Sequence, residues 1–230
     1  MPAIIITASQ LAAFGTTWIN NKGALSRTPP YSSSDLGKVF DTAVANALAQ
    51  MLGNIPVIRP NPNDLLPQHH NCVELGPVRV IGGVRPQNFD VGYRPDGIRF
   101  AFDSKTLNDA KSVGKNWQNM VNDLATEATT VHTRFPHAIV AFMVVIPTPC
   151  LVGSNRVAMV DTLERISRRI GIDAPNHLAE AISLALWDPH TGSIDPNLPD
   201  SSSILRIEQF STQIEQAYTS RYKGLPPHVN

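Results

Sequence analysis

The sequence predicts an α/β fold in which a central mixed sheet is flanked by helices. Three observations carry this expectation: an amphipathic helix pattern in the N-terminal part, a series of strand patterns after it, and a second amphipathic helix followed by a wholly apolar strand. The chain has 230 residues, of which 42% are hydrophobic and 17% charged, so it can bury a full core. We expect a single domain over residues 1–230.

The N-terminal part is expected to be mainly helical. The first strong helix is predicted from about residue 35 to residue 52, with Ser34 or Asp35 as its cap and a regular apolar stripe along one face. A shorter helix is predicted from Thr7 to Asn20. The stretch 54–68 is rich in Pro and Asn and indicates an irregular connection.

Three strand patterns follow. The first covers 73–81 and is broken by Gly76-Pro77; the next two cover 88–93 and 98–105. The last two are separated by Arg94-Pro95-Asp96-Gly97, in which Pro presets the backbone angle and Gly accepts a positive φ. These two strands therefore predict a β-hairpin.

A second helix is predicted from about Asp109 to Val131, and the apolar run 138–146 predicts a strand that is buried on both faces. The core of the fold is thus expected over about 34–147, in the order αβββαβ. The C-terminal part, about 150–230, is expected to add helices to this core. The three expected helices are Asn155–Ile170, Asn176–Trp187 and Ile204–Tyr222.

The composition excludes several classes of protein. Nineteen basic residues balance nineteen acidic ones, so net charge gives no signal for nucleic acid. Cys72 and Cys150 are too few for a disulfide framework or a thiolate zinc site, although one bridge remains possible. The chain begins without a signal-peptide pattern, and its longest apolar run is too short to span a membrane, so we expect no membrane association and a cytoplasmic location. Trp117 and Trp187 are expected to pack in the core.

The hairpin brings charged side chains to one face of the sheet. In the second strand, alternation places Phe100 and Phe102 towards the core and Asp103 and Lys105 together on the opposite face. In the first strand Asp90 is expected opposite Ala101 or Phe102, within diagonal reach of Asp103.

Two carboxylates and an ammonium group at one sheet surface suit phosphodiester hydrolysis. Carboxylate oxygens are the ligands that Mg²⁺ prefers, and the bound ion polarises a phosphate and lowers the pKa of its water. A lysine beside them can orient that water or stabilise the charge that develops.

These residues resemble the PD-(D/E)xK nuclease superfamily, which includes many type II restriction endonucleases. Phe89-Asp90-Val91, a hairpin and then Phe100-Ala101-Phe102-Asp103-Ser104-Lys105 match its acidic residue and its (D/E)xK tripeptide, within the same αβββαβ order. The resemblance implies a restriction-endonuclease-like fold, cleavage of double-stranded DNA by a homodimer, and Mg²⁺ as cofactor, with Mn²⁺ as a substitute. It also implies that Asp90 and Asp103 bind the metal and that Lys105 positions the attacking water.

Two acidic positions have alternatives. Asp96 forms a literal Pro-Asp with Pro95, but it lies at the tip of the expected turn, where Pro-Asp-Gly has a conformational reason. Asp90 is therefore preferred and Asp96 is the fallback. The family often adds an acid from the helix before the sheet; Asp41, at the edge of the apolar stripe, suits that catalytic and metal-binding role better than Asp35.

Two groups of polar residues could contact DNA. One flank of the second helix carries Lys111, Lys115, Gln118 and Asn122. A second basic cluster follows in the C-terminal part, with Arg156, Arg165, Arg168 and Arg169. An ordinary solvated helix face explains the first group equally well.

Other interpretations remain open. Asp103 and Lys105 could form only a solvated ion pair on a structural hairpin. Within the superfamily, a repair or junction-resolving nuclease is an alternative to a restriction enzyme, and a non-catalytic DNA-binding or assembly module is a third. His69-His70-Asn71-Cys72 fits a polar loop better than a metal site, and the hydrolase and nucleotide motifs G-x-S-x-G, G-x-x-x-x-G-K-[ST] and H-E-x-x-H are absent.

Overall fold

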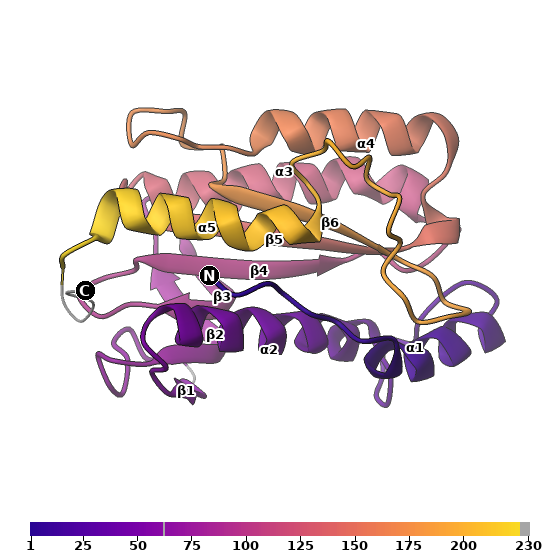
Figure 1. The fold of residues 1–230 in the computed structure, drawn as a ribbon, viewed down its shortest axis with the longest axis horizontal. Coiled ribbons are helices and arrows are strands. Elements are labelled where there is room, and N and C mark those ends of the chain that lie inside the picture. The colour runs from indigo at the N-terminus through magenta and orange to yellow at the C-terminus, as the bar shows by residue number, and fades with distance from the viewer. Residues whose placement is uncertain (62, 226–230) are drawn as a thin grey trace.

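The computed structural model describes residues 1–61 and 63–225, and it shows one six-stranded mixed sheet with helices on both faces (Figure 1). The strands follow one another across the sheet in chain order. They are β1 (Val57–Ile58), β2 (Val73–Ile81), β3 (Pro86–Tyr93), β4 (Phe100–Thr106), β5 (Ile139–Pro147) and β6 (Ala181–Trp187). The helices are α1 (Ala8–Asn20), α2 (Ser33–Met51), α3 (Val113–His132), α4 (Gly153–Ile166) and α5 (Ile207–Tyr222), with a short 3-10 turn at Thr148–Cys150.

The sheet has an antiparallel part and a parallel part. β2, β3 and β4 run antiparallel to one another, whereas β4, β5 and β6 are parallel and β1 is parallel to β2. The parallel strands are joined by helical crossovers, α3 between β4 and β5 and α4 between β5 and β6. Every residue of β5 and β6 is buried, as expected for parallel strands covered on both faces. The expected α/β class with a mixed sheet flanked by helices is confirmed.

Two helices lie on each face of the sheet. Gly37 of α2 lies against Ser104, and Phe210 of α5 packs edge-on against Phe102 with ring centroids 6.0 Å apart. Lys105, whose side chain points to the opposite face, reaches α3 instead. In Figure 1, α3 and α4 lie together on one side of the sheet, and α2 lies on the other. The face carrying Ser104 is thus covered by α2 and α5, and the face carrying Lys105 by α3 and α4.

The start of α2 is set by a reciprocal cap. Ser32 is the capping residue, rather than Ser34 or Asp35 as expected: its Oγ accepts from the backbone N–H of Asp35 (3.2 Å), and its own N–H donates to the Asp35 carboxylate (3.2 Å). Asp35 also accepts from Lys38 (2.9 Å). The helix therefore begins at Ser33, slightly earlier than expected.

The C-terminal part corrects the expectation of purely helical decoration. Residues 181–187, expected in a helix, form β6, which is the edge strand of the sheet. α4 ends at Ile166, before the expected Ile170, and Arg168 has a left-handed backbone with φ 62°. The core of the fold consequently extends well past residue 147.

Several smaller expectations can also be compared with the structure. The stretch expected to be irregular contains β1, and the break at Gly76-Pro77 is a shift of register inside β2 between Leu75 and Val78. Trp117 and Trp187 are buried, as expected. Cys72 and Cys150 are both free thiols, so the possible bridge is not formed. In the part of the chain that the structure describes, no helix is both long and apolar enough to cross a membrane.

Candidate active site

The pairing between β3 and β4 ends at the expected site, where the two strands separate. The two strands pair from Tyr93 and Phe100 to Val91 and Phe102, and the pairing ends there. Asp90 comes directly before Val91, the first residue of β3 that pairs with β4. Its carboxylate accepts the backbone N–H of Ser104 (3.1 Å), so a side chain takes the place of the next ladder bond.

This register differs from the expected one. Asp90 was expected opposite Ala101 or Phe102, but it lies past Phe102, level with Asp103. The difference arises at the turn between the strands. A hydrogen bond from Arg99 N to Tyr93 O (2.9 Å) closes this turn, and β4 begins only at Phe100, two residues after the expected Ile98. The difference brings the two aspartates closer than a diagonal pair.

Asp103 and Lys105 lie beside Asp90 as the alternation predicts. The carboxyl groups of Asp90 and Asp103 share a hydrogen bond. The Lys105 ammonium contacts Asp103 and also donates to Glu127 Oε1 of α3 (2.8 Å). The lysine is thus held between two carboxylates.

Asp41 reaches the same place from α2. It is only 5% exposed, its carboxyl group is hydrogen-bonded to the Ser104 hydroxyl, and its charge interacts with that of Asp90. Its Oδ1 has no hydrogen-bond partner among the described residues. The close approach of α2 depends on Gly37, because a Cβ at that position would lie 2.9 Å from Ser104 Oγ.

Burial and crowding of like charges dominate the electrostatics. Burial, and then the neighbouring carboxylate, raise the pKa of Asp41 and of Asp90 to about 8, and burial also raises the pKa of Asp103. Burial opposes the charge of Lys105, but Asp103 and Glu127 outweigh it and hold its pKa above the usual value. At neutral pH the cluster therefore favours protons on Asp41 and Asp90 unless another cation is present.

The donor chemistry of this cluster suits a hard divalent cation. Within residues 1–61 and 63–225, no three His, Cys, Asp or Glu side chains form a ready-made metal group. Mg²⁺, however, is usually held by one or two carboxylates, with waters and substrate phosphates filling its other positions. The hydrogen-bonded pair of Asp90 and Asp103 fits this smaller requirement, and the unpartnered Oδ1 of Asp41 offers a further oxygen.

Asp96, the fallback acid, is not part of the cluster. It is exposed in the turn, and its carboxylate accepts from Arg99 Nε (2.8 Å). The Arg99 guanidinium also stacks over the ring of Tyr222, 5.0 Å from its centroid. Asp96 therefore has a structural partner at the far end of the hairpin.

The sequence reasoning missed Glu127. This residue is 4% exposed on α3, and its Oε2 has no hydrogen-bond partner in the described chain. A signal was present, because the helical spacing places Glu127 on the buried stripe with Met120 and Leu124. A charged residue on a buried stripe needs a partner, and Lys105 is that partner.

The residues expected to contact DNA from α3 are exposed but not all helical. Lys111 lies in the turn before α3, whereas Lys115, Gln118 and Asn122 are exposed on the helix itself. Arg156, half-buried near the start of α4, belongs to the same region, because Cβ at Gly114 would lie 3.0 Å from the neighbouring Asn155 side chain. The starts of α3 and α4 therefore adjoin.

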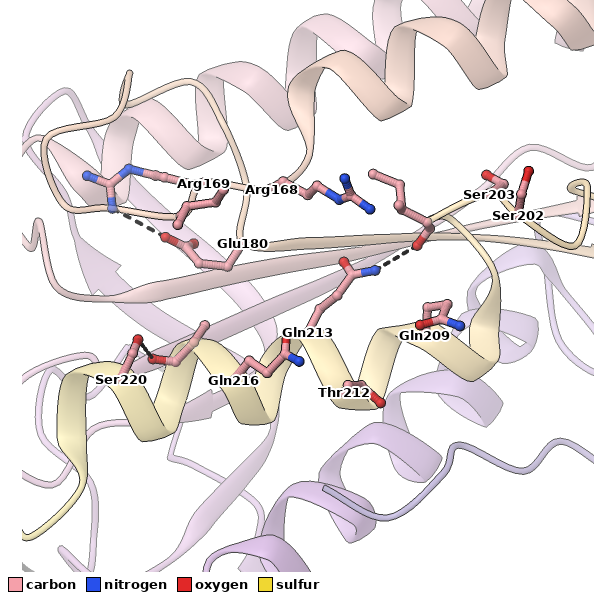
Figure 2. Close-up of a pocket in the computed structure, with 13 residues that line it drawn as sticks. Arg168, Arg169, Glu180, Ser202, Ser203, Gln209, Thr212, Gln213, Gln216 and Ser220 are labelled. Atoms are coloured by element: carbon pink, nitrogen blue, oxygen red, sulfur yellow. Dashed lines mark hydrogen bonds and ion pairs between the residues drawn. The ribbon is translucent and has the colours of Figure 1, made fainter.

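The arginines of the second basic cluster do not form one group in the structure. Arg165 bonds to its own helix, and Arg169 is buried and paired with Glu180 (3.2 Å). Figure 2 shows the guanidinium groups of Arg168 and Arg169 pointing in opposite directions. Arg168 lines a pocket of about 640 Å³ between α5 and the segment after α4, together with Gln213 and other polar residues, and no carboxylate of the candidate active site lines this pocket.

The histidine-rich loop is held by local bonds. His70 Nδ1 lies 2.7 Å from the carbonyl oxygen of Pro95, and Cys72 Sγ donates to the carbonyl oxygen of His69 (2.9 Å). These contacts fit a structural loop.

Comparison of the chain with protein families, curated proteins and solved structures found no match in any of the three.

Proposed function

We propose that the chain is a Mg²⁺-dependent endonuclease that cleaves double-stranded DNA, with a restriction-endonuclease-like fold and most similar in function to type II restriction enzymes. One observation carries the proposal: Asp90, Asp103 and Lys105 converge where the hairpin opens, on a sheet whose element order resembles the PD-(D/E)xK core. Apart from the two-residue strand β1 between α2 and β2, the order α2, β2, β3, β4, α3, β5 is the one that the resemblance implies.

Each residue has a role in this proposal. Asp90 and Asp103 would hold Mg²⁺, and Asp41 would add an oxygen ligand or a hydrogen bond to bound water. The ion would polarise the scissile phosphate and activate a water. Lys105 would orient that water and stabilise the extra negative charge on the phosphate, because it is held as an ammonium group by Asp103 and Glu127.

Two further parts of the proposal rest on the resemblance. The DNA duplex would be cut by a homodimer, in which each copy supplies one cluster. Lys111, Lys115, Gln118, Asn122 and Arg156 would contact the DNA backbone.

The test is cleavage of plasmid and genomic DNA with Mg²⁺, with EDTA as a blank. We expect Asp90→Asn, Asp103→Asn and Lys105→Ala each to lower the cleavage rate by about 10³-fold or more. Asp96→Asn is the matched control, since it removes the other acid of the hairpin, and it should cut like the wild type. Equal loss in Asp90→Asn and Asp96→Asn would contradict the assignment.

One observation favours a second candidate function. Lys105 already pairs with Asp103 and Glu127 without a metal, and such a self-contained ion-pair cluster would also suit a DNA-binding module without catalysis. A folded wild type that binds duplex DNA but cuts it with neither Mg²⁺ nor Mn²⁺ would select this candidate.

A further inference from the structure

Four exposed cations lie on two segments that meet at the end of β4, and two of them have no role in the proposed site. Lys22 and Arg27 belong to the segment between α1 and α2, and Lys111 and Lys115 to the start of α3. We call these four residues the basic bank. Among the described residues none of them forms an ion pair with a carboxylate; the carboxylate of the nearby Asp109 accepts the backbone N–H of Lys111 (2.9 Å). Their charge is therefore available to a partner.

Asn108 connects the two segments that carry the basic bank through hydrogen bonds. This residue is 7% exposed; its carbonyl oxygen accepts from Trp18 Nε1 of α1 (2.7 Å), and its Oδ1 accepts from the backbone N–H of Leu25 (3.2 Å). Its Nδ2 donates to Ser33 Oγ at the start of α2 (2.8 Å). One buried amide thus joins α1, the segment after it and α2 to the end of β4.

The backbone at Lys22 is held in an unusual conformation. Lys22 has φ 57° and Gly23 has φ 97°, and the carbonyl oxygen of Gly23 accepts the N–H of Ala110 (2.9 Å). A Cβ at Gly23 would lie 3.2 Å from the Cβ of Ala110. Gly23, the neighbour of Lys22, is therefore hydrogen-bonded to Ala110, the neighbour of Lys111. Lys22 itself has a left-handed backbone conformation, which non-glycine residues adopt at a cost in free energy.

The bank adjoins the carboxylate cluster. Asn108 follows Lys105 closely along the chain, and the intervening Thr106 donates its hydroxyl to Ser33 O (3.4 Å). In Figure 1 the arrowhead of β4 points to the side of the molecule where α1 lies. The carboxyl ends of parallel strands are the usual edge at which α/β proteins bind ligands.

We propose that Lys22 and Arg27 bind backbone phosphates of the duplex and that, with Lys111 and Lys115, they seat the DNA at the end of β4. This inference rests on the proposed function and adds α1 and the segment after it to the substrate-binding surface. DNA is favoured over an acidic protein because the bank consists of cations on long side chains and is continuous with a cluster suited to phosphodiesters.

The experiment measures binding of a mixed-sequence duplex in EDTA at several salt concentrations. The test variant is Lys22→Gln with Arg27→Gln. The matched control is Arg59→Gln with Lys223→Gln, which removes the same charge from exposed residues near β1 and at the end of α5, far from α1 in Figure 1. Circular dichroism and the thermal midpoint establish that both variants are folded.

We expect the slope of log Kd against log salt to fall by about two in the test variant, since each phosphate contact contributes roughly 0.9. The Kd at ~0.1 M salt should rise about tenfold or more, and the control should match the wild type. A wild type that binds and cuts DNA while both variants keep its slope would overturn this inference and leave the proposed function standing. A wild type that neither binds nor cuts DNA, or that binds acidic protein instead, would overturn both.

Discussion

At the scale of single residues, Lys105 decides how the candidate site would act. A lysine that serves as a general base must lose its proton, but the carboxylates of Asp103 and Glu127 outweigh the effect of burial and raise the pKa of Lys105. A permanent ammonium group can orient a water molecule and stabilise charge on a phosphate. Glu127 should therefore matter to the reaction through Lys105, without touching the substrate.

Glu127→Gln tests this role. We expect kcat for DNA cleavage to fall by about 10- to 100-fold, because the Lys105 ammonium loses one of the two carboxylates that position it. The Kd for DNA should stay within about twofold of the wild type. Asp123→Asn, an exposed change on the same helix, is the control. Unchanged kcat in Glu127→Gln would show that Asp103 alone holds the lysine.

The placement of Asp90, Asp103 and Lys105 was predictable from local rules, whereas that of Glu127 was not predicted. Strand alternation put Asp103 and Lys105 on one face, and the turn at Pro95-Asp96-Gly97 brought Asp90 to them. The expected register was wrong by one or two residues, because the length of a turn depends on contacts such as that between Arg99 and Tyr93. Glu127 lies on the buried stripe of α3, whereas the residues predicted to be functional on this helix lie on its polar flank.

At the scale of elements, β6 shows where periodicity stops being informative. Its residues, Ala181-Ile182-Ser183-Leu184-Ala185-Leu186-Trp187, are nearly all apolar, so neither the helical nor the strand period is visible. Ala and Leu also favour a helix, whereas the Val- and Ile-rich β5 was predicted correctly. Pairing with β5 makes this segment a strand, and that contact is a tertiary one.

A buried charge network joins β6 to the elements around it. Glu180 accepts the N–H of Val140 (2.7 Å), lies 3.2 Å from His132 of α3, and pairs with Arg221 of α5 (2.8 Å) and with Arg169. Burial opposes its charge, but His132 and Arg221 outweigh this and lower the pKa of Glu180. The network ties α3, α5 and the central strands together.

Glu180→Ala should lower the free energy of unfolding by about 3–5 kcal/mol, because buried cations lose their counterion. Urea unfolding followed by circular dichroism measures this loss. Asp161→Ala on α4 removes an exposed carboxylate and should change the value by less than about 0.5 kcal/mol. Similar values for the two variants would mean that the network contributes little.

The packing of α1 depends on Gly15. A Cβ there would lie 2.0 Å from the carbonyl oxygen of Pro189, so α1 or the loop after β6 must move. Gly15→Ala should destabilise the chain by about 1–3 kcal/mol, although Ala is the better helix former. Gly171→Ala, with nothing within 4 Å of the new Cβ, is the control for urea unfolding. A Gly15→Ala variant as stable as the wild type would show that α1 tolerates displacement.

At the scale of the whole molecule, the buried carboxylates of the candidate site lower the free energy of unfolding. The sheet and its helices form one hydrophobic core, yet Asp41, Asp90, Asp103 and Glu127 are buried or half-buried inside it, and of these four only Asp103 and Glu127 pair with Lys105. A structural ion pair needs one carboxylate, and the additional ones raise the free energy of the folded chain. Such a conflict between packing and charge is the pattern expected of a functional site.

This conflict should make stability depend on pH and on Mg²⁺. Asp41 and Asp90 have a pKa of about 8 when folded and near 3.8 when unfolded, so the folded chain binds more protons between these values. The free energy of unfolding of the metal-free protein should consequently fall as pH rises from about 5 to about 8. Millimolar Mg²⁺ should restore stability at pH 8 if it binds the deprotonated carboxylates.

Asp41→Asn isolates this effect, because it removes one of the two titrating groups and keeps the shape of the side chain. Its thermal midpoint should depend less on pH than that of the wild type, and at pH 8 without metal it should be the more stable protein. Asp173→Asn, an exposed change, should follow the wild type at every pH. Parallel curves for Asp41→Asn and the wild type would show that Asp41 carries the same charge in the folded and the unfolded chain, and the proposed strain at the site would then be absent.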